Sequence, residues 1–494
     1  MSSPAMVALP HLINIDRDTE LPVYLQISNG LIQQIKAGVL RPGSRLPGTR
    51  AMAQSFAVHR KTVVAAYEEL FSQGWIDVRP SQGTFVSESL PNVLPNKLSE
   101  VSEGRSIKHS GFTFYTKAHL KRVLPDIPQG LTLDEGIPDV RIAPVNDIIK
   151  HYRSFVARSY NSRHLSYGSV YGDALLRETL AGFLQETRGM AVEKDNIMIV
   201  RGSQMGTYLA SQLLFKNKEL AVVGETNYIA ANLTMLEAGA KVKTVSVDHK
   251  GISTSELRKL CGQEKVTAVY VTSHHHHPTT VTLSVERRIE LLQLAEEYGF
   301  AILEDDYDYD FHYRNAPLLP LASADRSGQV IYMGAICKIV APAYRVGYLV
   351  APKDFIDEVA HLRRIIDRQG DAILERSIAL MIRQGDYQRH TKKALKIYRD
   401  RRDHFCQLLK TELSEFVRFK VPEGGLAVWV ELREDMSWID IAEACRQKGL
   451  NIPDYQTYNF NHTANNGIRM GFASINFQEQ TQIVSVLKEV MNHL

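Results

Sequence analysis

The stretch GAICKIVAPAYRVGYLVAP, residues 334–352, places a lysine in the middle of an apolar run. Lys338 lies between Cys337 and Ile339, where burying an ammonium group is costly because the charge loses its hydration. The side chain can pack its stem and extend its charged end to water. Alternatively, it can act as a desolvated amine of lowered pKa that forms a Schiff base with an aldehyde. The stretch alone favours the first interpretation, and the rest of the chain favours the second.

Around this stretch, from about residue 129 onward, short apolar runs alternate with amphipathic segments. The runs are NIMIVRGS, ELAVVGE, VTAVYVTS, FAILEDD and QVIYMGA. Such alternation predicts an α/β domain with a mostly parallel sheet. Ligands of these sheets bind beyond the carboxyl ends of the strands, so the residues that end each run are the candidates for a site.

These run-ending residues have complementary chemistry. Asp305 ends one run, Lys338 follows another, and Arg345 comes seven residues after the lysine. The RGSQMG turn at 201–206 opens a helix, which is a ready anion site, and Tyr228 follows a further strand. Pyridoxal 5'-phosphate needs an amine for its aldehyde, a carboxylate for its pyridine nitrogen, and a cation with a helix N-terminus for its phosphate. Together the residues match this cofactor.

Residues 21–86 have a different pattern. Leu25, Ile27, Leu31 and Ile35 form a helical stripe in 21–40, and RPGSRLPGT breaks it. TRAMAQSFAV reads as a short helix capped by Thr49, and HRKTVVAAYEELFSQGW reads as another. WIDVRPSQGTFVSE alternates around a turn and predicts a two-stranded hairpin. Three helices followed by a hairpin are typical of a winged helix-turn-helix.

The charge of this segment supports the same interpretation. Between Leu21 and Tyr67 there is no acidic residue, and several basic residues fall at the expected starts of the second and third helices. A charge run is usually a solvated face, but an acid-free run in this pattern is typical of a DNA-binding surface. The basic residues are Lys36, Arg41, Arg45, Arg50, Arg60 and Lys61.

Length and composition set the broad class. The 494 residues predict two or three domains, and 44% hydrophobic with 23% charged residues are typical of a soluble globular protein. Four scattered cysteines indicate neither a zinc site nor a disulfide framework. No apolar run is long enough to cross a membrane, so we expect a cytoplasmic protein. Residues 87–128 are polar and proline-punctuated in their first half and are predicted to form a linker.

The segment LPGTRAMAQSFAVHRKTVVAAYEELFSQGWIDVRPSQGTFV resembles the GntR-type winged helix. The resemblance implies that double-stranded operator DNA is a partner and that His59–Leu70 is the recognition helix. It places the wing tip at Gln82-Gly83. Some relatives carry an arginine where this chain has Val64, so the operator sequence does not follow. The implied DNA contacts are Arg50, Arg60, Lys61, Thr62, Gln82 and Gly83.

Further along, DEGIPDVRIAP, LSYGSVYGDALLRETLAGFL, RGSQMG, HPTTVTLSVERR, ILEDDYDYDF, the lysine stretch and GIRMGFA resemble fold-type I aminotransferases. Their order and spacing are most similar to the aminotransferase-like domain of MocR/GabR-type regulators. The resemblance implies an α+β winged helix-turn-helix domain at 1–86 and the linker at 87–128. An α/β aminotransferase-like domain at 129–494, with a small C-terminal α/β subdomain, would follow. It also implies a homodimer that reads two half-sites.

The resemblance also implies roles for single residues. Lys338 would form the Schiff base, with Asp305 at the pyridine nitrogen and Tyr307 at the ring hydroxyl. Tyr228 would lie against the ring face. Arg469 would bind the carboxylate of an amino-acid-like effector, since a guanidinium holds a carboxylate with two hydrogen bonds. The phosphate would be bound by Arg345, Gly202, Ser203 and Gln204.

The chain departs from the family pattern in several places, and RGSQMG lacks a second glutamine that is common in the family. Ala335 and Cys337 replace serines near the lysine, so weaker binding of the cofactor phosphate is expected. The loop HHHHPTT replaces a Ser-His-Gln-aromatic-Pro-Thr-Gly loop, with Thr280 in place of glycine. Consecutive histidines on an extended segment point to opposite faces and suit few metal geometries. We therefore expect no metal and interpret His274–His277 as pocket-lining or capping residues. Asp306, Asp308 and Asp310 are interpreted as solvated loop acids.

The predicted function is a pyridoxal-phosphate-dependent, DNA-binding transcriptional regulator. An amino-acid-like effector would form an external aldimine in place of Lys338 and favour one domain arrangement over another. Two alternatives stay open at this point. The chain can be a working aminotransferase with an accessory DNA-binding domain. Physiological catalysis is not expected, and a residual half-reaction stays open because the chain keeps the groups that it needs. It can also be a regulator whose degenerate cofactor site binds another ligand.

Overall fold

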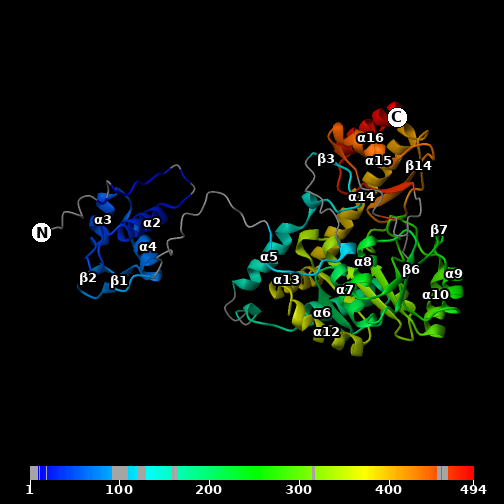
Figure 1. Cartoon of the computed structure of the whole chain (residues 1–494), viewed down its shortest axis with the longest axis horizontal. Coiled ribbons are helices and arrows are strands. Elements are labelled where there is room, and N and C mark those ends of the chain that lie inside the picture. Colours follow the sequence, from blue (N-terminus) through cyan, green and yellow to red (C-terminus); the bar gives the residue numbers. More distant parts are fainter. Residues whose placement is uncertain are drawn as a thin grey trace. The chain divides into compact units, whose positions relative to one another are not determined.

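The computed structural model describes residues 9, 12–17, 19, 21–91, 109–120, 130–157, 162, 164–313, 318–452, 458 and 466–494. The chain divides into two compact units, Met1–Tyr115 and Thr116–Leu494, which Figure 1 draws with their element labels. Each unit is described by itself. Of the predicted linker, residues 92–108 and 121–129 lie outside the described residues.

The first unit is a winged helix-turn-helix, as predicted. Apolar side chains from its three helices and its hairpin form one core, and α2 packs against α4. The hairpin strands are antiparallel, with Ile76 opposite Val86 and Arg79 opposite Gly83. The elements are α2 (Val23–Lys36), α3 (Thr49–Ser55), α4 (Arg60–Ser72), β1 (Ile76–Arg79) and β2 (Gly83–Val86).

The start of one helix in this unit differs from its predicted form. Thr49 is the first residue of α3, whose N-cap is Gly48, and no side chain caps this helix. The prediction that Thr49 caps the helix is therefore wrong. The Thr49 hydroxyl instead accepts a hydrogen bond from Nε of Arg60 at 3.3 Å, which ties the starts of α3 and α4 together. Helix α4 is capped by Nδ1 of His59, which accepts from the backbone N–H of Lys61.

The second unit is built on a seven-stranded sheet of order β4-β12-β11-β10-β9-β5-β6. Strand β12 runs antiparallel to both of its neighbours, and the other pairings are parallel. The strands are β4 (Ile197–Val200), β5 (Leu220–Gly224), β6 (Lys241–Val245), β9 (Val266–Val271), β10 (Ala301–Asp306), β11 (Val330–Ala335) and β12 (Gly347–Val350).

Helices cover both faces of this sheet (Figure 1). Side chains of successive strand residues alternate between two hydrophobic clusters: Ile197 and Ile199 belong to one, Met198 and Val200 to the other. This explains why the strands read as continuous apolar runs. One cluster includes side chains from α7 (Ser203–Leu214), α8 (Ile229–Glu237) and α12 (Lys353–Ile366). The other includes side chains from α6 (Ala174–Arg188), α9 (Thr254–Cys261), α10 (Val285–Tyr298) and α13 (Ala372–Arg383).

A smaller C-terminal subdomain follows the long helix α14 (Asp386–Glu412). Its antiparallel sheet consists of β13 (Val417–Phe419), β14 (Ala427–Leu432) and β16 (Gly467–Gly471). Helices α15 (Trp438–Gln447) and α16 (Phe477–His493) pack together beside it, in orange and red in Figure 1. The short strand β3 (Leu131–Thr132) pairs with β15 (Leu450–Asn451), so a segment near the start of this unit is held by the C-terminal subdomain.

Helix α5 (Val145–Val156) packs against α13, and the other remaining α-helix and strands that the structure describes are short. They are α11 (Leu321–Ala324), β7 (Val247–Asp248) and β8 (Gly251–Ile252). Among the helices that the structure describes, none combines the length and the apolar character needed to cross a lipid bilayer.

Candidate cofactor and effector site

One edge of the large sheet collects the site residues predicted from the strand ends. Parallel strands β10 and β11 end at Asp306 and Ala335, and Lys338 follows in a short 3-10 turn. Because β12 is antiparallel, its beginning lies at the same edge, and Arg345 precedes it by two residues. Strands β4 and β5 end at this edge too, ahead of Gly202 and Tyr228.

Asp305 presents an unpaired carboxylate oxygen inside the protein. Its side chain is buried, and Oδ2 accepts a hydrogen bond from the Tyr270 hydroxyl at 3.0 Å. Oδ1 is buried too and has no hydrogen-bond partner among the described residues. Burial raises the pKa of Asp305 to about 7. A protonated pyridine nitrogen supplies the donor and the positive charge that such an oxygen lacks.

The start of α7 and Arg345 form an anion site. Gly202 has a φ of 80°, and a Cβ there would lie 2.6 Å from Nη2 of Arg345. Only glycine therefore allows the guanidinium to approach the helix start. Arg345 donates from Nη2 to the carbonyl oxygen of Arg201 at 3.0 Å. Ser203 and Gln204 open the helix, where backbone N–H groups lack helical acceptors and the helix dipole favours negative charge.

Lys338 is half-buried beside an aromatic ring. Its Nζ lies 5.8 Å from the centre of the Tyr307 ring. Burial lowers the pKa of Lys338, and Asp308 is the strongest opposing influence. A lowered pKa increases the neutral fraction of the amine, the form that attacks an aldehyde. These properties agree with the amine chemistry predicted for Lys338.

Two tyrosines flank this amine. The Tyr307 hydroxyl donates to the carbonyl oxygen of His275 at 3.0 Å and accepts from Nη2 of Arg469 at 3.2 Å. Tyr228 is the N-cap residue of α8, and its hydroxyl lies 3.5 Å from Oε1 of Gln204. Its ring meets the His277 imidazole edge to face, with centroids 5.0 Å apart. Burial raises the pKa of Tyr228 to about 12, so its hydroxyl stays protonated at neutral pH.

Arg469 is a buried cation without a carboxylate partner among the described residues. It lies on β16, its side chain is only 1% exposed, and no described carboxylate lies within ion-pair distance. Its guanidinium donates to the carbonyl oxygens of Glu135 and Pro278 at 2.8 and 3.1 Å. Burying an unpaired charge costs several kcal/mol, on the order of 3–5 kcal/mol when a buried pair loses one member. An anionic ligand would offset this cost.

Three of the four loop histidines are structural groups behind the site. Nδ1 of His274 lies 2.9 Å from Asp306, and Nδ1 of His275 lies 2.7 Å from Asp308. His276 contacts the carbonyl oxygen of Thr226 through Nε2. Only His277 faces the pocket tyrosines, and burial lowers its pKa. Within the described residues, no three metal-ligating side chains converge on one point.

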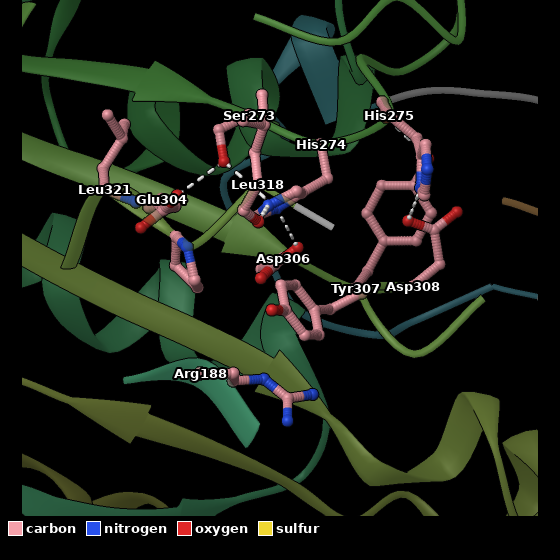
Figure 2. A network of polar contacts seen from close by, with 12 residues as sticks. Arg188, Ser273, His274, His275, Glu304, Asp306, Tyr307, Asp308, Leu318 and Leu321 are labelled. Atoms are coloured by element: carbon pink, nitrogen blue, oxygen red, sulfur yellow. Dashed lines mark hydrogen bonds and ion pairs between the residues drawn. The ribbon is translucent and has the colours of Figure 1, made fainter. Parts of the chain in front are cut away.

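The interpretation of Asp306 and Asp308 as solvated loop acids is wrong, because both carboxylates are buried. Figure 2 shows Asp306 beside His274 and Asp308 beside His275. Asp306 also accepts from the Tyr332 hydroxyl at 2.8 Å. Burial alone would raise the pKa of Asp306, but His274 and Tyr332 lower it to about 2. Asp310 is not free either, since it pairs with the buried Arg188 at 3.0 Å.

The residues at this edge fit pyridoxal 5'-phosphate. The unpaired oxygen of Asp305 fits the pyridine nitrogen, and the Gly202–Arg345 approach fits the phosphate. Cys337 precedes Lys338 and is buried, and burial raises the pKa of its thiol. Strand alignment could have identified Tyr270, which the sequence-based assignment missed, because β9 and β10 are parallel neighbours.

The predicted DNA contacts lie at the starts of two helices and at the hairpin tip of the first unit. Arg50 is in the first turn of α3, while Arg60, Lys61 and Thr62 form the first turn of α4. Arg50, Arg60 and Lys61 are exposed. Gln82 and Gly83 lie at the tip of the hairpin, with Gly83 beside the Arg45 side chain.

Comparison with known proteins finds one known family for each of the two units. The family of bacterial regulatory proteins called gntR matches residues 23–86, and the family aminotransferase class I and II matches residues 129–487. A solved kynurenine aminotransferase from Pyrococcus horikoshii is 25% identical, with a TM-score of 0.72. The match covers 77% of this chain and 97% of that chain.

Two curated relatives match nearly the whole chain. The probable rhizopine catabolism regulatory protein MocR of Rhizobium meliloti is 25% identical, covering 97% of this chain and 95% of its own length. The regulator TauR of Rhodobacter capsulatus is 28% identical, covering 91% and 93%.

Fold, site and relatives together define a DNA-binding transcriptional regulator with an aminotransferase-type domain, whose cofactor is pyridoxal 5'-phosphate. The chain belongs to the aminotransferase class I and II family and, through its GntR winged helix, to the MocR-type regulators.

The loop beside the site contains a strained backbone position. Thr280 has a φ of 62°, in the left-handed region that disfavours a β-branched residue. Thr280→Gly is therefore expected to raise the free energy of unfolding by about 1 kcal/mol. Urea unfolding midpoints would measure the change. The matched control is Thr279→Gly, because Thr279 has no positive φ and should lose stability. Equal destabilisation by both substitutions would contradict the strain.

Proposed function

We propose that this regulator senses a small amino compound bearing a carboxylate and converts its binding into a change in DNA affinity. Two groups at one site carry this proposal. Lys338 is a desolvated amine, and Arg469 is a buried cation that has no described carboxylate partner. Lys338 would bind the cofactor aldehyde, and Arg469 would bind the effector carboxylate. The aldehyde, when bound, can condense with either the lysine or the effector amine.

The other residues at the edge would hold and orient the cofactor. Asp305 would keep the pyridine nitrogen protonated, and Arg345 with Gly202, Ser203 and Gln204 would bind the phosphate. Tyr228 would lie against the ring, and Tyr307 would reach the ring hydroxyl by giving up its contact with the His275 carbonyl.

The first 86 residues would read DNA as the winged-helix half of a homodimer, with residues 87–128 as the linker and 129–494 as the sensing domain. Arg50, Arg60, Lys61 and Thr62 would meet phosphates and bases, and the wing tip Gln82-Gly83 would approach the neighbouring groove. Two heads would contact two half-sites. Such a protein would act in the cytoplasm, at the nucleoid.

The experiment begins with a DNA site selected from a random pool by the full-length protein. Fluorescence anisotropy then measures the Kd for that site with pyridoxal phosphate alone and after addition of amino acids, ω-amino acids and amines. We expect at least one carboxylated amine to change the Kd, by about 5- to 150-fold. Steady-state amino-group transfer with no effect on DNA binding would favour the aminotransferase alternative. No response of either kind would contradict the proposal.

Helix α8 offers a route from the pocket to the linker. Tyr228 caps its N-terminus in the pocket, and Glu237 is its last residue. Glu237 binds both Lys117 and His119, with 3.1 Å to Nε2 of His119. Both partners lie within the described residues 109–120 of the predicted linker. A shift of Tyr228 against a bound ring would therefore move the point where the linker is anchored.

Glu237→Gln is expected to uncouple the sensing domain from DNA binding. The substitution removes the charge that holds Lys117 and His119 but leaves the pocket intact. The effector-dependent change in Kd should shrink by about 2- to 30-fold, while DNA affinity without effector and effector binding stay close to wild type. Glu264→Gln, which removes the partner of Lys241 and Lys243 elsewhere on the surface, is the control. An undiminished response in Glu237→Gln would rule out this route.

A further inference from the structure

We propose that Asp308, oriented by His275, is a positioning residue that holds the free Lys338 side chain as an ammonium ion. The inference rests on the proposed function, in which an effector replaces Lys338 at the cofactor. Asp308 would then be the counter-ion that receives the displaced lysine.

The geometry of Asp308 supports this role. It follows β10 by two residues and is 3% exposed. Oδ1 is fixed by Nδ1 of His275 at 2.7 Å, as Figure 2 shows. Oδ2 is buried and has no hydrogen-bond partner among the described residues. A buried acceptor left without a donor costs about 1–3 kcal/mol, so this oxygen is expected to have a partner in at least one functional state.

Asp308 and Lys338 line the same enclosed cavity of about 10 Å³, together with Tyr307 and Tyr348. A space of this size holds about one water molecule. A single water in this cavity would bridge the lysine ammonium and the carboxylate. Asp310 lines the cavity too, but its charge is already taken up by Arg188.

The charges around the lysine favour Asp308 as its partner. Burial lowers the pKa of Lys338, Asp308 is the strongest group that opposes this, and Cys337 and Asp134 oppose it more weakly. Arg469 acts in the same direction as burial. Asp308 in turn contacts His275, and the His312 ring lies 5.6 Å from that of His275. Burial raises the pKa of Asp305 most strongly, and the negative charge of Asp308 raises it further.

This arrangement has a consequence for sensing. Only a neutral amine condenses with an aldehyde, so a lysine held as an ammonium returns to the cofactor less readily. Asp308 would thus prolong the effector-bound state. His275 would act through Asp308 by fixing its orientation, without contacting the effector or the cofactor.

Asp308→Asn tests the inference in cofactor-free, full-length protein. Competitive labelling of amines at a series of pH values, read by mass spectrometry of the peptide containing Lys338, gives the pH midpoint of its reactivity. Removing a nearby carboxylate should move the midpoint down by about 1 pH unit or more. Asp310→Asn, two residues further on, is the matched control and should leave it unchanged. Asp308→Glu, which keeps the charge, should restore most of the shift.

An unchanged midpoint in folded Asp308→Asn protein would overturn the inference. Should that variant not fold, His275→Gln removes the group that orients Asp308 and is expected to give a smaller shift in the same direction. No shift in that variant would be equally decisive against it. The labelling uses neither effector nor DNA, so its result is independent of the proposed function. If the midpoint shifts but no amine changes the DNA affinity, the role of Asp308 is supported and the proposed sensing function is rejected.

Discussion

Lys338→Ala is expected to abolish covalent attachment of pyridoxal phosphate to the protein. Lys338 places a desolvated amine at the edge of the sheet where Asp305 and the start of α7 lie. An alanine removes the amine and leaves the groups for the ring nitrogen and the phosphate in place. The variant should therefore bind the cofactor only reversibly, and its effector response should disappear because no linkage is left to exchange.

Two readouts test this prediction. Wild-type protein loaded with the cofactor should keep its visible absorption through gel filtration, and borohydride should fix the cofactor on the peptide that contains Lys338. The variant should lose both signals completely. Lys353→Ala is the control, because Lys353 is an exposed lysine that pairs with Asp357 at the start of α12. Labelling of other lysines in the variant to the wild-type extent would contradict the assignment.

A wild-type protein that also fails to retain the cofactor would have a different meaning. Ala335 and Cys337 would then mark a lost cofactor site, as the third interpretation of the sequence allows. The double substitution Ala335→Ser and Cys337→Ser would distinguish a weakened cofactor site from a lost one. Recovery of the absorption in that double variant would show that the remaining groups are intact.

The fold and the outline of the site could be predicted because parallel strands share one carboxyl edge. The apolar runs that end at Asp305 and before Lys338 therefore had to place both residues on the same side of the sheet. Arg345 joins them because β12 is antiparallel. The winged helix was equally accessible, since prolines and glycines at 42–48 separate its first two helices and Gly74 follows its third.

The buried histidine–aspartate pairs could not be read from local sequence. The segment around Asp306 and Asp308 has the composition of a solvated acidic turn, and nothing within it reveals burial. Their partners His274 and His275 lie more than thirty residues earlier, in the loop after β9. Only the parallel register of β9 and β10, with Ala301 opposite Ala268, brings the two segments together. The contact of Lys117 with Glu237 is beyond prediction for the same reason, because 120 residues separate them.

Arg469→Gln is expected to weaken the response to a carboxylated effector by about 30-fold or more. Removing one member of a buried, hydrogen-bonded charge pair costs about 2–5 kcal/mol, and each 1.4 kcal/mol, roughly, is a tenfold change in affinity. Arg469→Lys should fall between the variant and wild type, because lysine keeps the charge but lacks the two-pronged geometry. The measurement is the effector concentration that gives half of the maximal change in DNA affinity.

The structural role of Arg469 makes the choice of controls decisive. Its guanidinium also donates to the carbonyl oxygens of Glu135 and Pro278 and to the Tyr307 hydroxyl. Losing it can therefore change the loop that contains Pro278 as well as effector binding. Borohydride fixation of the cofactor on Lys338 reports whether the rest of the site is intact. Arg446→Gln, an exposed arginine on α15, controls for the loss of charge in the same subdomain.

A matched pair of effectors then separates recognition from damage. The response to an amine that lacks the carboxylate should be the same in Arg469→Gln and wild type, because Arg469 has no group to bind in that compound. If both compounds lose potency equally while the cofactor stays fixed on Lys338, Arg469 shapes the pocket but does not recognise the carboxylate. The buried cation would then be balanced by the carbonyl dipoles that already surround it, and the effector would not need to be an acid.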